Sequence, residues 1–338
     1  PLALRRGTVA EVDSTGPVAR VRVDVGGELR PAIAYTDLTG QVEAGDEVVV
    51  NCSALDLGLG SGGFDIVHVN LTRGLDGRGD PGTHVMKLNY TSLQHAVKPF
   101  EETAEGGRAE GRRAAGGDGP VAVIALHGQL PCVAWAARGE TKIGYVQSVG
   151  GALPGALSDV VRELRERELI AAHVTAGPTF GGEQEAITVA GALRAGFSEG
   201  WDGAIVGPGP GIIGSATELG HGGLAALDNA HAALALGCRT LLVPRMSESD
   251  PRARHRGLSH HSAQVLELLL RPVLVPLPEG AEAPGGDHES VEFAVDVEGY
   301  AASGLPVSTM ARTIEEDELF FRAALAGGEA LAREIDGV

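Results

Sequence analysis

The sequence has few aromatic residues and few lysines, and each shortage excludes a class of function. Phe, Trp and Tyr make up 4% of the 338 residues, too few for the stacking platforms that bind single-stranded nucleic acids. The three lysines, Lys87, Lys98 and Lys142, lie outside any GxxxxGK[ST] sequence, which excludes a P-loop nucleotidase. No apolar run reaches the roughly 18 residues of a membrane-spanning helix.

Cysteine is also scarce, and its placement indicates a reducing compartment. The three cysteines, Cys52, Cys132 and Cys238, are scattered and odd in number, so they form neither a disulfide framework nor a CxxC metal pair. We expect each to be a small buried hydrophobic residue. No charged-then-apolar signal sequence opens the printed sequence. We therefore expect a cytoplasmic protein.

Charge and glycine content narrow the choice of partner. The formal net charge is −18, from 27 basic and 45 acidic residues, and a nucleic-acid binder needs a basic face instead. The expected partner is a small-molecule anionic ligand, with no nucleic acid and no membrane, and a homo-oligomer is compatible with this class. The 50 glycines should lie in turns and at close backbone contacts.

The first part of the chain reads as a small all-β, barrel-like domain over residues 1–72. Valine-rich, partly alternating segments with turn signals between them predict short strands: Arg5–Asp13, Val18–Val25, Glu28–Ala34, Glu47–Asn51 and Phe64–Asn70. Gly26-Gly27 marks a hairpin. Residues 73–102 form an interdomain connection, and the low-complexity residues 103–119 predict a flexible loop.

Residues 120–338 read as an α/β domain that ends in a C-terminal helix. Short apolar runs alternate with amphipathic segments, which predicts a doubly wound, mostly parallel sheet. The expected helices are 130–137, 153–167, 183–195, 224–236, 259–270 and 313–335. We expect Thr313 to cap the last helix.

Ligands bind beyond the carboxyl ends of the strands in such sheets, and the loops expected there are rich in glycine. Backbone N–H groups at helix N-termini favour anions. The candidate anion-binding residues in these loops are Gly150, Gly151, Gly207, Gly209, Gly211, Gly214 and Ser215. Gly209, Gly211 and Gly214 also match the GxGxxG dinucleotide pattern. We discount this match because Pro208 and Pro210 stiffen the turn and the loop follows the fourth strand rather than the first.

The densest chemistry lies in the segment SESDPRARHRGLSHHS, residues 247–262. Ser259 is a good N-cap for the following helix, which places His260 and His261 in its first turn, where the helix dipole favours neutral imidazole. The candidate catalytic residues are His255, His260, His261 and Asp250, and the candidate substrate-binding arginines are Arg252, Arg254 and Arg256. Structural ion pairs and helix capping are the alternative reading of this segment.

The same histidines allow a divalent metal as cofactor. A zinc site needs three or four converging ligands, and the candidates are His127, His221, His255 and His260. The sequence does not settle whether they converge.

These observations favour a hydrolase or transferase that acts on a small phosphorylated or nucleotide-like substrate at the carboxyl edge of the sheet. In this hypothesis histidine transfers protons and arginine neutralises charge. The alternative hypothesis is a non-catalytic ligand sensor or scaffold protein. The sequence leaves open whether the protein is an enzyme.

The order of the motifs resembles a known family. The matching segments are RRGTVAEV, LGLGSGGFDIV, KLNYTSLQ, YVQSVGGALP, GPTFGGEQEAITV, GPGPGIIGSAT and SESDPRARHRGLSHHS, which span nearly the whole chain. They resemble the uncharacterised bacterial domain-of-unknown-function family numbered 3866, from Actinobacteria and Firmicutes. The resemblance implies a bacterial cytoplasmic protein and no particular reaction.

Overall fold

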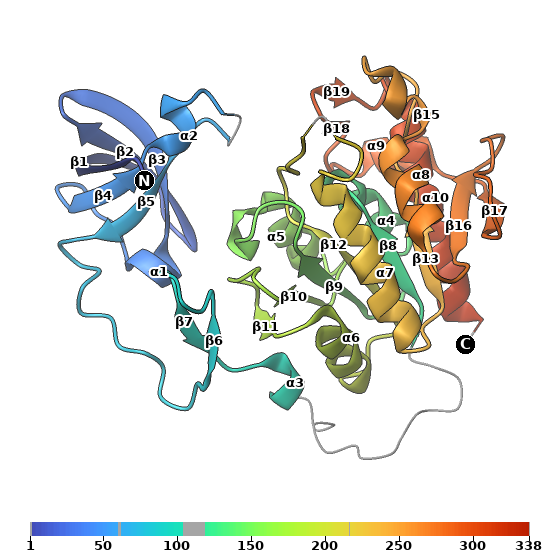
Figure 1. Cartoon of the computed structure of the whole chain (residues 1–338), viewed down its shortest axis with the longest axis horizontal. Coiled ribbons are helices and arrows are strands. Elements are labelled where there is room, and N and C mark those ends of the chain that lie inside the picture. The colour runs from blue at the N-terminus through green and yellow to red at the C-terminus, as the bar shows by residue number, and fades with distance from the viewer. Residues whose placement is uncertain (1, 60–61, 104–118, 216, 338) are drawn as a thin grey trace. The chain divides into compact units, whose positions relative to one another are not determined.

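The computed structural model describes residues 2–59, 62–103, 119–215 and 217–337. The chain divides into two compact units, Pro1–Val97 and Lys98–Val338 (Figure 1), and each is described by itself. Of the low-complexity segment 103–119, for which we expected a flexible loop, residues 104–118 lie outside the described residues.

Five strands of the N-terminal unit form a closed barrel in the order β1-β2-β3-β5-β4. The strands are β1 (Leu4–Ser14), β2 (Val18–Val25), β3 (Glu28–Tyr35), β4 (Glu47–Asn51) and β5 (Asp65–Asn70). Alternate residues fill the interior, among them Val21, Val23, Val48 and Val50. The β3–β5 pair is parallel and the other pairs are antiparallel, as in Greek-key barrels of the OB type. The expected barrel is confirmed.

The glycine pair between β2 and β3 makes the hairpin turn that the sequence predicts. Gly26 and Gly27 have φ of 65° and 90°, as a two-residue type I′ turn requires, and Val25 pairs with Glu28 across it. The other described elements of this unit are α1 (Thr36–Thr39), α2 (Ser53–Asp56), β6 (Val85–Lys87) and β7 (His95–Val97).

The second unit is built on an eight-stranded sheet in the order β11-β10-β9-β12-β8-β13-β16-β17. Its strands are β8 (Val121–Ile124), β9 (Ile143–Ser148), β10 (Ala172–Ala176), β11 (Gln184–Ala186), β12 (Gly203–Pro208), β13 (Thr240–Val243), β16 (Leu274–Pro278) and β17 (Glu289–Phe293). Every neighbouring pair is parallel. The parallel sheet expected from the sequence is confirmed.

Helices cover both faces of this sheet, as in doubly wound folds. On β8, Val121 and Val123 pack in one core while Ala122 and Ile124 pack in the other. The first core also holds residues of α6 (Val189–Ser198), α7 (Ala225–Ala235) and α8 (His260–Leu268). The second core holds residues of α4 (Leu130–Ala136), α5 (Asp159–Glu166), α9 (Val297–Ala302) and α10 (Glu318–Asp336).

Short elements complete the unit. They are α3 (Phe100–Thr103), four 3₁₀ turns, η1 (His127–Gln129), η2 (Gly155–Leu157), η3 (Gly222–Leu224) and η4 (Ala253–His255), and two hairpins, β14 (Met246–Ser247) with β15 (Gly257–Leu258) and β18 (Ser308–Thr309) with β19 (Arg312–Thr313).

Three helix starts differ from the expectation. The helix expected from residue 183 begins at Val189, because Gln184–Ala186 pairs with β10 as an edge strand. The helix expected from residue 153 begins at Asp159, where Ser158 caps it. The last helix begins at Glu318 and not after Thr313, because Arg312 and Thr313 belong to a hairpin.

The topology places the loops after β12 and β13 on either side of β8. Because all eight strands are parallel, their carboxyl ends lie at one edge of the sheet. Strands β8 and β12 are neighbours in the sheet. Helix α4 follows β8, helix α7 follows β12, and the two helices lie on opposite faces. This edge is therefore a topological switch point, where open α/β sheets bind ligands. Among the described helices, none has both the length and the apolar character needed to cross a membrane.

Candidate functional site

Four histidines gather at this edge, from two separate loops. His221 directly precedes η3, in the loop after β12, while the other three follow β13. The hairpin of β14 and β15 turns the chain back, which returns His255 to the start of α8. Ser259 caps that helix, its Oγ accepting a hydrogen bond from His261 N at 3.3 Å. The cap fixes His260 and His261 in the first turn, as the sequence predicts.

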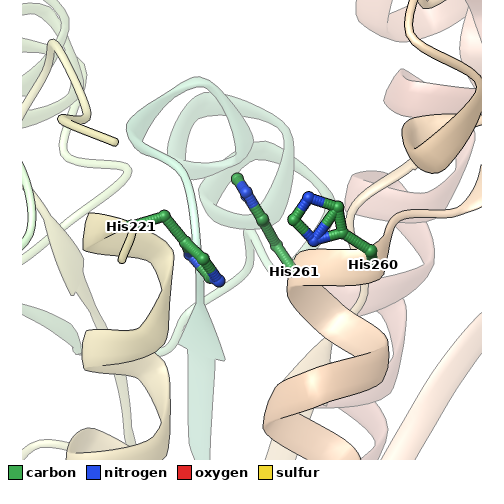
Figure 2. Close-up of side chains that lie close together, drawn as sticks. All are labelled: His221, His260 and His261. Atoms are coloured by element: carbon green, nitrogen blue, oxygen red, sulfur yellow. The ribbon is translucent and has the colours of Figure 1, made fainter. Parts of the chain in front are cut away.

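The four imidazole rings contact one another. His221 and His261 stack with ring centroids 3.7 Å apart, and His255 and His260 stack at 4.7 Å. The ligand atoms of His221, His260 and His261 all lie within 4.8 Å of one another. Figure 2 shows these three rings turned toward one another, between the start of α8 and the segment that leads into α7. We call His221, His255, His260 and His261 the histidine cluster.

Several ring nitrogens of the histidine cluster are buried and have no hydrogen-bond partner among the described residues. They are Nδ1 of His221, Nε2 of His255, both nitrogens of His260 and Nδ1 of His261. Leaving one buried polar atom unpaired costs about 1–3 kcal/mol. Five unpaired nitrogens in one place therefore indicate a binding site for a partner. A metal ion is the partner that accepts several imidazole lone pairs at once.

A hydrogen bond at the far side of the His221 ring fixes which of its nitrogens holds a lone pair. Gln264 Oε1, an acceptor, lies 3.1 Å from His221 Nε2, so Nε2 carries the proton and Nδ1 is free to bind. His255 Nδ1 lies 2.7 Å from Ser259 Oγ, a hydroxyl that can donate or accept, and His255 Nε2 is buried without a partner among the described residues. Such contacts orient metal-binding histidines in known sites.

The surroundings favour the neutral form of three rings of the histidine cluster, those of His255, His260 and His261. Burial, followed by the nearby charges of Arg245 and Arg252, lowers the pKa of His255 to about 4. Burial and neighbouring cationic groups also lower the pKa of His260 and His261. Neutral imidazole is the form that binds metals.

The three arginines expected from the sequence, Arg252, Arg254 and Arg256, differ in their hydrogen-bond partners. Arg252 donates to both carboxylate oxygens of Asp250 at 3.0 Å. Arg256 Nε donates to the backbone oxygen of Asp250 at 3.0 Å. Arg254 is exposed, makes no ion pair with the described residues, and its charge acts on His260. Arg254 is therefore available to an anion.

Asp250 belongs to an ionic network behind the histidines. Its buried carboxylate accepts hydrogen bonds from Arg245 at 2.9 Å, from Arg252 and from Arg312 at 3.5 Å. Burial alone would raise the pKa of the Asp250 carboxyl, but the hydrogen bonds from Arg252 and the adjacent arginine charges hold it far below its usual range. Both carboxylate oxygens are occupied, so Asp250 positions arginines in this structure.

The glycine-rich loops after β9 and β12 meet at the same edge, and their backbones are in close contact. A Cβ on Gly150 would lie 2.4 Å from the oxygen of Gly222, and one on Gly151 would lie 2.1 Å from the oxygen of Gly209. The Ala152 N–H already donates to the carbonyl oxygen of Pro210 at 2.7 Å. These contacts join the loops after β9 and β12 and thereby position His221.

The remaining candidate anion-binding residues differ in their surroundings. A Cβ on Gly207 would lie 2.2 Å from Ile124 Cγ1, and Gly214 pairs with His221 in an isolated bridge. Gly211 has a φ of 70°, with open space around it. Ser215 Oγ is exposed and lies 3.0 Å from the oxygen of Gly220.

His127, a metal candidate from the sequence, lies apart from the cluster with both ring nitrogens in use. Its Nδ1 is 3.1 Å from the oxygen of Pro208, and its Nε2 is 2.7 Å from Ser158 Oγ. Burial lowers its pKa to about 4. Its neighbour His173 stacks on Tyr145 with centroids 5.4 Å apart.

The sequence analysis missed Gln264 and Arg312. Gln264 lies one helical turn after His260 and His261 and so shares their face of α8, a signal that was present. Arg245 follows β13 directly, at the edge where the sequence predicts ligand binding, whereas Arg312 reaches Asp250 through folding alone.

The fold and the cluster define a class, a parallel α/β protein with a cluster of four histidines at the carboxyl edge of its sheet. The chain belongs to the family described as "Protein of unknown function (DUF3866)", whose family model matches residues 31–328. This confirms the resemblance seen in the sequence.

Comparisons beyond the family are sparse. Among solved structures, the chain is similar to YjeQ from Thermotoga maritima, with 15% sequence identity, a TM-score of 0.16 and 51% of each chain covered. The match therefore spans about half the length of that protein. A comparison with curated proteins found none that matches.

Proposed function

We propose that the protein is a metal-dependent hydrolase that acts on a small anionic substrate, with the metal ion bound by His221, His260 and His261. One observation carries the proposal: ligand atoms of these three side chains lie within 4.8 Å of one another, and buried nitrogens on all three have no partner among the described residues.

The donor set favours a zinc-like transition-metal ion. Three neutral imidazoles suit zinc and its neighbours, whereas calcium and magnesium prefer oxygen ligands. Catalytic zinc sites use three protein ligands and leave a fourth position for water or substrate. The cluster supplies three nitrogens that approach one another, at the edge of the sheet where ligands bind.

The chemistry follows from this arrangement. A divalent ion held by His221, His260 and His261 would lower the pKa of a water and polarise the substrate. Hydrolysis would join the water oxygen to phosphorus or to a carbonyl carbon and break the bond to the leaving-group oxygen. His255, whose Nε2 has no other partner among the described residues, would carry one water proton to the leaving group. In a transferase the hydroxyl of a second substrate replaces water.

The charge around the histidine cluster supports an anionic substrate. Neutral histidines around a divalent ion leave its charge uncompensated, and Asp250 is already held by arginines. Arg254, exposed and without an ion pair among the described residues, adds a cation at the entrance. Phosphate and carboxylate groups match both the ion and the guanidinium fork.

The remaining expectations about partners and location become part of this proposal. The net charge of −18 supports a small-molecule ligand in preference to nucleic acid or an anionic membrane surface. Cys52, Cys132 and Cys238 are buried thiols, which supports a cytoplasmic location. A homo-oligomer remains an expectation, and in the alternative hypothesis of a scaffold protein residues 1–72 would dock a partner.

A second candidate is a non-catalytic metal or ligand sensor. It is favoured by the proximity of His255, whose ring centroid lies 4.8 Å from that of His261. A fourth histidine ligand would close the coordination sphere, and closed four-ligand sites are structural. The two candidates differ in whether His255 binds the metal.

The test is a hydrolysis screen of the zinc-, manganese- and iron-loaded full chain against phosphate monoesters, phosphodiesters, nucleotides and acyl phosphates. We expect one substrate class to be hydrolysed, and the His260→Ala variant to lose that activity. His68→Ala, a histidine of the barrel, is the matched control and should keep full activity. If the chain binds metal, and His255→Ala lowers metal affinity while no substrate is turned over, the sensor is the better account.

A further inference from the structure

Arg245 is a buried arginine beside the histidine cluster that uses little of its hydrogen-bonding capacity. Its side chain is 2% exposed. Its Nη2 donates to Asp250 at 2.9 Å and contacts the Met310 sulfur at 3.4 Å. Its Nε is buried without a partner among the described residues. An arginine has five N–H donors, so an ion pair and a weak thioether contact leave this one underused.

The backbone places Arg245 against the first turn of α8. Its N–H donates to Ser262 Oγ at 2.8 Å, and its carbonyl oxygen accepts from Ser259 N at 2.9 Å. Its positive charge acts on His255, His260 and His261. Arg245 is thus adjacent to the histidine cluster.

Met310, whose sulfur contacts Arg245, stands at the tip of a hairpin with unusual backbone geometry. Met310 and Ala311 form the two-residue turn between β18 and β19, with φ of 48° and 60°. Glycine and asparagine normally fill such turns, because other side chains are strained at positive φ. Strain of this kind gathers at ligand clamps and switch regions.

The base of this hairpin is firmly held, while its tip is accessible. Arg312 Nε donates to Asp317 at 2.8 Å, and Ile314 N donates to the oxygen of Val307 at 2.8 Å. Thr309 packs so closely on Gly128 that a Cβ there would lie 2.5 Å from the threonine hydroxyl. Met310 is 37% exposed. The hairpin is therefore bonded at its base, and the Met310 side chain at its tip is open to solvent.

We infer that Arg245 binds an oxyanion of the substrate beside the metal, and that the Met310 side chain covers Arg245 until this oxyanion displaces it. The inference deepens the proposed function and rests on it, since it assigns to one guanidinium the recognition of the substrate's anionic group. Oxyanions of phosphate or carboxylate form bidentate bonds with arginine, which a thioether cannot do. The ion pair with Asp250 holds the guanidinium in place.

The probe is inorganic phosphate, measured by isothermal titration calorimetry with the zinc-loaded and the metal-free full chain. Met310→Gly removes the cover and also relieves the turn strain. We expect it to tighten phosphate binding about threefold or more, because the uncovered state is then always populated. Ala311→Gly is the matched control: it relieves strain at the neighbouring position, keeps Met310, and should leave the affinity unchanged.

Arg245→Lys provides the second arm. The lysine keeps the charge toward Asp250 but loses the planar fork, and we expect phosphate binding to weaken about tenfold with zinc stoichiometry unchanged. Equal affinities for Met310→Gly and Ala311→Gly, or no phosphate binding by the wild type in either form, would overturn the inference. If Arg245→Lys fails to fold, the comparison of Met310→Gly with Ala311→Gly tests the inference by itself. Zinc stoichiometry without phosphate tests the proposed function separately, so the two failures are distinguishable.

Discussion

Gln264 Oε1 accepts a hydrogen bond from His221 Nε2 across 3.1 Å, and this contact links the loop after β12 to the helix after β13. It fixes the His221 tautomer that leaves Nδ1 free. The metal proposed for the histidine cluster therefore depends on a residue that does not touch it.

Replacing Gln264 should lower metal affinity when the new side chain cannot accept the hydrogen bond from His221, and should not lower it when the new side chain can. We expect Gln264→Leu to weaken zinc binding about tenfold or more, since losing such an orienting contact typically costs 10–100-fold. Gln264→Glu should keep or raise the affinity, because a carboxylate accepts the same bond and makes the imidazole more basic. Competition with a chromophoric chelator measures both, with Gln41→Ala in the barrel as control. Equal loss in the Leu and Glu variants would contradict the role of the hydrogen bond.

Gly222 tests whether close backbone packing positions His221. A Cβ at this residue would lie 1.9 Å from the oxygen of Gly150, so Gly222→Ala must shift one of the two loops. Overpacking of this kind costs about 1–3 kcal/mol. We expect a lower free energy of unfolding in urea and weaker zinc binding. Gly285→Ala is the control, because its Cβ meets nothing within 4 Å; the account fails if both variants behave alike.

The half-buried His127 and the buried His173 predict a loss of stability in mild acid. Burial lowers their pKa values to about 4 and about 3, while histidine in the unfolded chain titrates near 6.5. Below that pH the unfolded state binds protons that the folded state refuses, so stability is full above about pH 6.5 and falls toward pH 4. Each such histidine lowers the free energy of unfolding by about 1.4 kcal/mol per pH unit.

Urea unfolding of metal-free protein between pH 7 and pH 4.5 measures this slope. His127→Gln removes one titrating group while keeping a polar side chain that can reach Ser158. We expect the variant to show a slope shallower by about one proton. Parallel curves for wild type and variant would contradict the neutral state of His127.

The strained turn at Met310 and Ala311 predicts that one substitution increases stability. Ala311 has a φ of 60°, and a residue held in this region costs about 1 kcal/mol or more relative to glycine. Ala311→Gly should raise the free energy of unfolding by about 1 kcal/mol, measured in urea. Ala232→Gly within α7 is a contrasting control and should lower it, because glycine is unfavourable inside a helix. Destabilisation by Ala311→Gly would show that the turn is not strained.

Much of the fold follows from local patterns in the sequence. Valine alternation predicts the barrel strands, and apolar runs followed by amphipathic segments predict the parallel sheet. The pattern fails at β11, where Gln184–Ala186 is a short edge strand with partly buried residues, and at β19, where two residues pair only because Ser308 and Thr309 lie opposite. Elements this short carry no periodicity, so tertiary packing determines them.

The candidate site also has a part that local sequence predicts and a part that only the tertiary fold determines. Ser259 and the paired histidines after it could be predicted because a helix cap is local. The approach of His221 requires the strand order, which places β8 between β12 and β13. His127 follows β8 at the same edge but is turned toward Ser158 instead, and no feature of the sequence distinguishes these two outcomes.

The most direct test of the central claim is the metal content of the full chain, combined with X-ray absorption at the metal edge. After loading with zinc and desalting, we expect about one equivalent bound per chain, with nitrogen neighbours at about 2.0–2.1 Å. His261→Ala should lose this metal, while His68→Ala should retain it. Failure of the folded wild type to bind zinc, manganese or iron, or equal retention by His261→Ala, would show that the histidine cluster is not a metal site.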